Sequence, residues 1–185
     1  MASISTQNIQ NRIPVSMSNK LYDIISKKIQ DTWPMSCILF IDIVNNQELE
    51  KSYNCRREMV KNTRGFVEEL QLFHGTHADF IDPICNNGFD PTRNTVSAYG
   101  RDSYFAKNAS YSFKYMKSKD TTGISYMFLC DVIVGLKIRG TNNFIINTEL
   151  FDNSVDNIEN PSIIVTPYSD GAFPRYVVAF HKEAL

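Results

Sequence analysis

The order of the hydrophobic patterns limits the fold of this chain more than any other feature. Early in the chain, apolar residues recur at helical spacing from Leu21 to Ile29, behind Ser18 or Asn19 as the N-cap. Later in the chain, apolar runs of strand length dominate. These runs cover residues 124–138, 162–166 and 176–180. Because helices and strands are segregated rather than alternating, the sequence predicts an α+β fold and not a parallel βαβ fold.

Shorter elements are expected between these patterns. The sequence predicts further strands at 37–44, 70–74, 103–106 and 144–146, and further helices at 49–60, 78–85 and 109–116. A bend is expected at Gly135. The turn residues Ser169-Asp170-Gly171 lie between the last two strands, which predicts that those strands form an antiparallel pair.

Length and charge restrict the class of protein. The chain has 185 residues, which fits one domain. Residues 1–17 are rich in Ser, Asn and Gln and predict a flexible arm, so the folded domain is expected over residues 18–185. The formal net charge of −1 lacks the basic field that non-specific nucleic-acid binding needs, although a local basic patch is compatible with it.

The cysteines indicate free thiols rather than a disulfide framework or a metal site. Cys37, Cys55, Cys85 and Cys130 form no CxxC pair and match no zinc spacing. Three of them lie among apolar neighbours and are expected to be buried. These features predict a reducing compartment, and hence an intracellular protein of the cytoplasm or nucleus. The chain does not begin with the charged and apolar segments of a signal peptide, and it contains no run of 18 apolar residues. The sequence therefore predicts neither a signal peptide nor a membrane span.

Polar and aromatic side chains follow several short predicted elements. They comprise His74 and Gly75 after one strand, Tyr104 in the next, and Ser112 and Tyr115 on a short helix. Each has a simpler explanation alone, since histidines at strand ends and tyrosines in strands are common packing residues. Together they supply an imidazole, two phenols, a hydroxyl and an accessible main chain. That set suits a flat aromatic amide such as nicotinamide, the reactive end of NAD.

These residues resemble the catalytic domain of the poly(ADP-ribose) polymerase superfamily, the diphtheria-toxin-like ADP-ribosyltransferases. The resemblance runs from about Trp33 to Phe180 and is closest to the mono-ADP-ribosylating members. It is carried by the segments 43–46, 72–76, 88–89, 97–100, 104–106, 109–112, 150–156, 161–163 and 172–176. It implies the ADP-ribosyltransferase fold, with two packed, mostly antiparallel sheets flanked by short helices. It also implies an NAD-dependent glycosyltransferase that releases nicotinamide.

The resemblance also implies roles for individual residues. His74 matches the histidine that contacts the adenine-side ribose of NAD, and Tyr104 matches the tyrosine that lines the nicotinamide pocket. Gly75 and Ser112 match the pair that holds the nicotinamide carboxamide. Tyr115 matches the ring that stacks on nicotinamide. Two weaker candidates for the adenosine side are Thr76 and Arg93.

The third position of the family's catalytic triad falls on Ile163, where chain-building relatives have a glutamate. Isoleucine can neither accept a proton nor orient a ribose hydroxyl, so a sugar hydroxyl is a poor acceptor here. The His74-Tyr104-Ile163 set therefore resembles the mono-ADP-ribosylating pattern. The implied partners are NAD as substrate and a protein acceptor, including the chain itself, with an RNA acceptor left open. A monomer without metal or membrane attachment is expected.

Two departures from the family pattern favour an alternative function. Asp102 stands where the family commonly has a glycine that takes a positive φ, and its charge could repel the NAD pyrophosphate. Pro167 is expected just inside a central strand, where it removes a ladder hydrogen bond. The alternatives are a catalytically silent binding module of the same fold, or an RNA 2′-phosphotransferase-like enzyme, which would need a basic cleft. Whether the chain is a stand-alone protein or an excised domain stays open.

Overall fold

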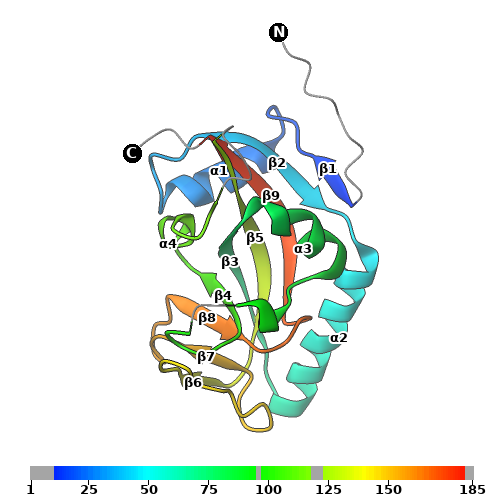
Figure 1. Ribbon diagram of the computed structural model, residues 1–185. Coiled ribbons are helices and arrows are strands. Elements are labelled where there is room, and N and C mark those ends of the chain that lie inside the picture. The colour runs from blue at the N-terminus through cyan, green and yellow to red at the C-terminus, as the bar shows by residue number, and fades with distance from the viewer. Residues whose placement is uncertain (1–10, 95–96, 118–122, 182–185) are drawn as a thin grey trace.

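A twisted nine-stranded sheet forms the centre of the molecule (Figure 1). The computed structural model describes residues 11–94, 97–117 and 123–181. The strands lie in the order β1-β2-β9-β5-β3-β4-β8-β7-β6, and all neighbours are antiparallel except β6 and β7. The predicted α+β class with mainly antiparallel pairing is confirmed.

The strands and helices have the following bounds. The strands are β1 Arg12–Pro14, β2 Ile38–Val44, β3 Glu68–Thr76, β4 Ser103–Ala106, β5 Ile124–Val134, β6 Lys137–Arg139, β7 Asn153–Val155, β8 Ile163–Thr166 and β9 Ala172–His181. The α-helices are α1 Lys20–Gln30, α2 Gln47–Arg64, α3 Ile81–Asn87 and α4 Ala109–Phe113, and the 3₁₀ helices are η1 Ala78–Phe80 and η2 Pro91–Arg93.

The two expected sheets are joined into one. The strands β1, β2, β9, β5 and β3 form one part, and β4, β8, β7 and β6 form the other. A single residue pair, Phe73 with Ala106, connects β3 to β4. Because the ladder is this short, β4 leaves β3 soon after the pair, and the edge of β3 beyond Phe73 is not covered by β4.

The strand predictions fail in two places. Residues 144–146 are not a strand, and the strand of this region is β7, at Asn153–Val155. The last two strands do not pair with each other, because β8 lies between β4 and β7 whereas β9 lies between β2 and β5. The turn at residues 169–171 thus carries the chain between the two parts of the sheet. Local turn chemistry predicted a hairpin, but long-range pairing decided the partners.

Helices cover both faces of the sheet, at positions that the apolar spacing predicts. The Asn19 side chain accepts a hydrogen bond from the Leu21 N–H and so caps α1, as expected. Ile25 and Ile29 of α1 are buried against the same face as Ala109 of α4. The helix α3 packs on the opposite face. Consecutive residues of a strand point to opposite faces, so β3 presents alternate side chains to α3 and to α4.

The predicted flexible arm is wrong for its last residues. Arg12–Pro14 form β1 and pair with β2, and the Val15 side chain is buried. The Arg12 guanidinium lies 3.7 Å from the Asp42 carboxylate and 3.4 Å from that of Asp82 in α3. Polar composition suggested disorder, but strand pairing and this buried ion pair hold the segment to the domain. Residues 1–10 of the predicted arm lie outside the described part of the chain.

The exposed surface corrects one further prediction. Cys85 and Cys130 are buried, but Cys37 and Cys55 are exposed, so two thiols rather than three are enclosed. Apolar neighbours in sequence did not bury Cys37, because it precedes the paired residues of β2.

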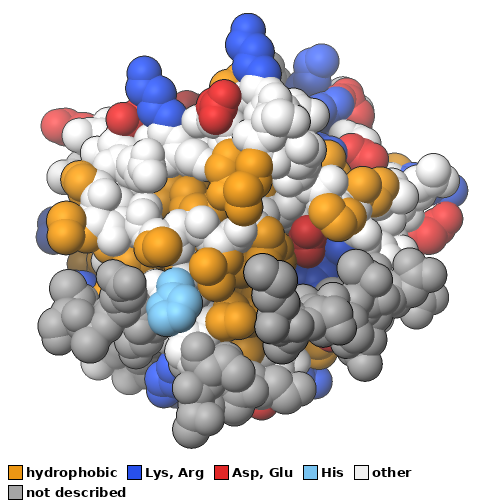
Figure 2. Space-filling view, turned by 90° about the horizontal axis from the view of Figure 1, so that it is seen from above, with side chains coloured by type: hydrophobic (Ala, Val, Ile, Leu, Met, Phe, Trp, Pro, Cys, Tyr) orange, Lys and Arg blue, Asp and Glu red, His pale blue; other side chains and the backbone are white. Residues whose placement is uncertain are grey.

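Figure 2, the view from above, shows hydrophobic side chains gathered in the middle of that face. Among the described residues, no helix is long and apolar enough to cross a membrane.

Candidate active site

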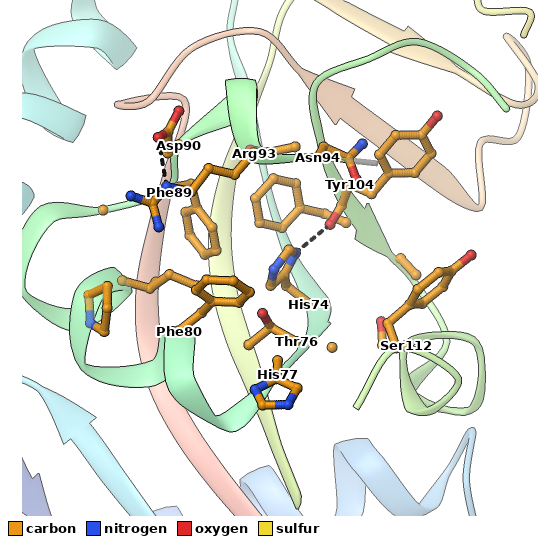
Figure 3. A pocket seen from close by; sticks show the side chains of 18 of the residues that line it. His74, Thr76, His77, Phe80, Phe89, Asp90, Arg93, Asn94, Tyr104 and Ser112 are labelled. Atoms are coloured by element: carbon orange, nitrogen blue, oxygen red, sulfur yellow. Dashed lines mark hydrogen bonds and ion pairs between the residues drawn. The ribbon is translucent and has the colours of Figure 1, made fainter. Parts of the chain in front are cut away.

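A large pocket lies at the uncovered edge of β3, between α3 and α4 (Figure 3). Its volume is about 1050 Å³, at the upper end of the range for small-molecule sites. The pocket thus has room for a ligand much larger than one aromatic ring. Seven of the eight residues singled out from the sequence line it, namely His74, Gly75, Thr76, Arg93, Tyr104, Ser112 and Tyr115.

His74 is held in one orientation by its surroundings. Its Nδ1 lies 2.8 Å from the Tyr104 carbonyl oxygen, and its ring packs against the rings of Phe89 and Phe105, with centroids 5.0 and 5.4 Å away. Burial lowers the pKa of His74, opposed by this hydrogen bond, so the neutral form is favoured. A carbonyl oxygen only accepts, so Nδ1 carries the proton. The lone pair of Nε2 is then available to accept a hydrogen bond from a ligand hydroxyl.

The main chain of Gly75 faces the same pocket. Phe73 pairs with Ala106 of β4, and its carbonyl oxygen accepts a hydrogen bond of 3.0 Å from the Ser112 hydroxyl. Gly75 lies two residues further along β3, so its N–H and C=O groups point to the same side, beyond the end of the β3–β4 ladder. A donor and an acceptor on one residue match the two hydrogen-bonding groups of a carboxamide.

Ser112 approaches the main chain of β3 from α4. The helix lies so close to β3 that a Cβ on Gly75 would stand 1.9 Å from the Ser112 carbonyl oxygen. Glycine is therefore required here by packing as well as by ligand access. The Ser112 side chain is buried and points at the main chain of β3. Its hydroxyl oxygen can accept from a ligand amide, or can turn from Phe73 to donate to it.

Tyr104 contributes its ring rather than its hydroxyl to the pocket. The hydroxyl accepts from the Tyr99 N–H at 2.8 Å and donates to the Gly100 carbonyl at 2.7 Å. These two bonds fix the turn that precedes β4. Burial raises the pKa of Tyr104, which keeps the phenol neutral. The side chain is thereby held as a rigid wall, and its carbonyl orients His74.

Tyr115 lines the pocket from a turn and not from a helix. The helix α4 ends at Phe113, earlier than the predicted residue 116, and the Tyr115 N–H donates to the Ser112 carbonyl at 3.0 Å. The Tyr115 hydroxyl donates to the Tyr111 hydroxyl at 3.3 Å, with ring centroids 5.6 Å apart. Tyr111 therefore holds the phenol of Tyr115. The sequence motif contained Tyr111, but no role was assigned to it.

The two weaker candidates lie on the other side of His74. Thr76 is buried at the end of β3 and lines the pocket. Arg93, at the end of η2, is exposed and forms an ion pair of 3.1 Å with Asp90. An exposed guanidinium on a short surface helix can turn towards a phosphate, because the pair with Asp90 is solvated and weak.

Ile163 lies directly behind residues that line the pocket. Its side chain is only 3% exposed and is not among the residues that line the cavity. It pairs with Ala106 and forms a small apolar cluster with Ala106 and Val165, against which Tyr104 and Tyr111 pack. The sequence placed Ile163 with the catalytic residues, but the structure places it behind the aromatic wall of the site.

Neither Asp102 nor Pro167, the two departures from the family pattern, distorts the backbone. Asp102 does not adopt a positive φ, whereas Gly100 does, at +133°. Burial raises the pKa of Asp102, and its side chain lines a second hollow beside the main pocket. Pro167 is wrongly placed by the sequence, since β8 ends at Thr166 and the proline follows the strand. Neither residue interrupts a strand or the lining of the main pocket.

Acid should weaken the binding of a ribose-containing ligand. His74 has a folded pKa below its ordinary value of 6.5, and only its neutral form offers Nε2 as an acceptor. Titration with ADP-ribose between about pH 5 and 8 should show lower affinity as pH falls through that pKa. The same shift affects folding. Because the unfolded chain protonates His74 more readily than the folded chain does, the free energy of unfolding should fall as pH drops below 6.5. An ADP-ribose affinity that rises in acid would contradict this assignment.

The mainly antiparallel sheet and the pocket at the edge of β3 fit the ADP-ribosyltransferase class, which the comparison with known families shows. The chain matches the poly(ADP-ribose) polymerase catalytic domain over residues 19–150, and it belongs to that family. Among the described residues, no group of three or more His, Cys, Asp or Glu side chains could hold a metal ion.

Curated relatives cover most of this chain. It is 33% identical over 180 residues to protein mono-ADP-ribosyltransferase PARP12 of Homo sapiens, an alignment that covers 91% of this chain and 25% of the relative. The human mono-ADP-ribosyltransferase PARP14 is 31% identical over 89% of this chain and 10% of its own length. The human mono-ADP-ribosyltransferase PARP11 is 26% identical over 97% of this chain and 62% of its own. The chain thus spans between 10% and 62% of the length of these relatives.

Proposed function

We propose that this domain transfers a single ADP-ribose unit from NAD to a protein acceptor and releases nicotinamide. The observation that carries the proposal is the amide clamp of Gly75 and Ser112, which opens into the same pocket as the imidazole of His74. The names of the relatives support it, since each describes a mono-ADP-ribosyltransferase.

The residues of the pocket suit a reaction that depends on positioning. The clamp would hold the carboxamide, Tyr104 and Tyr115 would enclose the ring, and His74 would accept a hydrogen bond from a ribose hydroxyl. The bond between the ribose C1′ and the nicotinamide nitrogen breaks, and its electron pair leaves with nicotinamide. A carboxylate oxygen of the acceptor, or a thiol sulfur that gives up its proton to solvent, then forms a bond to C1′. Fixing both partners in this way lowers the barrier without a protein nucleophile.

The buried Ile163 is compatible with a carboxylate acceptor. The side chains of Asp and Glu are ionised at neutral pH, so they can attack C1′ without giving up a proton. A sugar hydroxyl would need a base, and isoleucine offers none. The domain should therefore favour acidic side chains over the ribose of a previous unit.

Incubation with labelled NAD tests the proposed activity. The label should enter the chain or an added protein, and mass spectrometry should place it on carboxylate or thiol side chains. Free nicotinamide should appear in equal amount. A domain that binds neither NAD nor a benzamide in calorimetry would instead be the silent module, and the proposal would then be wrong.

The product should carry single units. Without a base at position 163, transfer to a sugar hydroxyl is expected to be about 10²- to 10⁴-fold slower than in an enzyme with one. With NAD in excess, denaturing gels should show one discrete shift for each modified site. Ladders of increasing length would contradict the role assigned to Ile163.

A further inference from the structure

Positive charge gathers on the side of the pocket where the proposed nicotinamide clamp lies. The segment 103–117, which carries Tyr104 and Ser112, contains three lysines and no Asp or Glu. Two of these lysines, Lys107 at the end of β4 and Lys114 at the end of α4, are exposed. Lys114 also lines the pocket. These two residues form the basic rim.

Both lysines of the basic rim have only neutral partners. The Lys107 Nζ donates to the Asn160 side chain at 3.1 Å, and Lys107 follows the strand residue that pairs with Ile163. The Lys114 Nζ stands 5.7 Å from the centroid of the Tyr111 ring, which lines the pocket. Neither ammonium group forms an ion pair with a carboxylate of the described residues. Because lysine has a flexible stem, both charges can turn towards a ligand.

NAD itself has no use for cations at this position. Its nicotinamide ring is positively charged, and its negative charge lies on the two phosphates, for which Arg93 is the candidate partner. Figure 3 shows Ser112 and Arg93 on opposite sides of His74. A lysine beside the clamp gains nothing from a positively charged ring, so the basic rim points to a second ligand that is negatively charged.

We propose that the basic rim binds acidic residues that flank the modified carboxylate of the acceptor protein. The proposal rests on the proposed function and specifies the kind of acceptor segment. C1′ is bonded to the nicotinamide nitrogen, so the acceptor carboxylate has to reach a carbon beside the clamp. Its neighbours in the acceptor chain then lie at Lys107 and Lys114. Opposite charge also speeds the encounter and rejects basic segments.

A protein segment fits this surface better than a nucleic acid does. The basic rim has two charges, and the whole chain has a formal net charge of −1, which is far from the extended basic field that binds a phosphate backbone. Acidic side chains are also the acceptors that can attack C1′ without a base at position 163.

Two peptides of equal length test the proposal. Each has one Glu as the acceptor, flanked by cysteic acid in the acidic peptide and by Asn in the neutral peptide. The sulfonate of cysteic acid is negatively charged but is a poor nucleophile, so both peptides offer one site. Each exposed ion pair contributes about 1.4- to 5-fold, so the wild type should show a KM about 2- to 25-fold lower for the acidic peptide. This preference should shrink between about 50 mM and 0.5 M salt.

The double variant Lys107→Gln/Lys114→Gln should remove the preference. Its KM for the acidic peptide should rise to that for the neutral peptide, while kcat and the affinities for benzamide and ADP-ribose stay within about twofold of the wild type. The matched control is Lys51→Gln/Lys61→Gln, which removes two exposed lysines of α2 that lie outside the pocket. The control should keep the full preference.

The proposal is overturned if the wild type uses both peptides with the same KM, if Lys107→Gln/Lys114→Gln keeps the preference, or if the control loses it equally. A 5′-phosphorylated oligonucleotide that is labelled in preference to the acidic peptide would also overturn it. In each of these cases nicotinamide is still released and an acceptor is labelled, so the proposed function stands. If the wild type labels no acceptor and releases no nicotinamide, the proposed function fails and this proposal fails with it.

Discussion

Gly75→Ala should abolish benzamide and NAD binding and destabilise the fold at the same time. The new Cβ would stand 1.9 Å from the carbonyl oxygen of Ser112 and 2.8 Å from its carbonyl carbon, so α4 has to move. Overpacking of this kind costs about 1–3 kcal/mol, which corresponds to roughly 2–12 °C in Tm for a chain of this size. A clamp displaced by about 1 Å can lose on the order of 10²-fold in function. Thermal melts and benzamide calorimetry measure the two effects.

Two controls separate the clamp from general loss of stability. Gly65→Ala places a side chain at φ +78° in the C-cap of α2, where the new Cβ would meet no atom within 4 Å apart from those of adjacent residues. It should cost about 1–2 kcal/mol of stability and leave benzamide affinity unchanged. Ser112→Ala removes only the hydroxyl and should weaken benzamide binding about 2- to 12-fold. If Gly75→Ala bound benzamide as tightly as Gly65→Ala does, the clamp would be wrongly placed.

His74→Ala should lower NAD affinity about 5- to 150-fold, through the loss of hydrogen bonds worth about 1–3 kcal/mol. The substitution removes the Nε2 acceptor, and it also leaves the Tyr104 carbonyl without the hydrogen bond that it accepts from Nδ1. It opens a gap beside Phe89 and Phe105 as well, so some loss of stability is expected. The rate of incorporation from labelled NAD should fall by at least as much as the affinity.

The His74→Ala prediction can be checked with two ligands and with a second histidine as control. Because His74 is assigned to the ribose, His74→Ala should weaken ADP-ribose binding far more than benzamide binding. His181→Ala changes an exposed histidine at the end of β9, outside the pocket, and should leave both affinities unchanged. Labelling of His74→Ala at the wild-type rate would refute the assignment.

The sequence predicted which residues meet in the pocket better than how the strands pair. His74, Gly75, Tyr104 and Ser112 lie on short segments whose type the apolar spacing indicated, and the family resemblance gave their order. The strand at residues 144–146 and the pairing of β8 with β9 were wrong. A three-residue strand such as β7 has too few side chains to show a period, and pairing depends on partners far away in the chain.

Other features of the site had no signal in the sequence. The narrow gap between Gly75 and α4, the bond from Tyr115 to Tyr111 and the burial of Ile163 all depend on distances between separate elements. The sequence also raised doubts at Asp102 and Pro167. The backbone shows that Asp102 has no positive φ and that Pro167 lies beyond the end of β8.

The sequence by itself determined the α+β class, the family and the chemical groups available to a ligand, because these follow from local apolar spacing and from residue types. Only the tertiary structure decided that β4 leaves β3 after one pair, which exposes the main chain of Gly75. It also decided which ring nitrogen of His74 can accept a hydrogen bond from a ligand, namely Nε2, since the Tyr104 carbonyl binds Nδ1. Such relations are set by the packing of distant segments, where angstrom differences determine which polar groups stay free to bind.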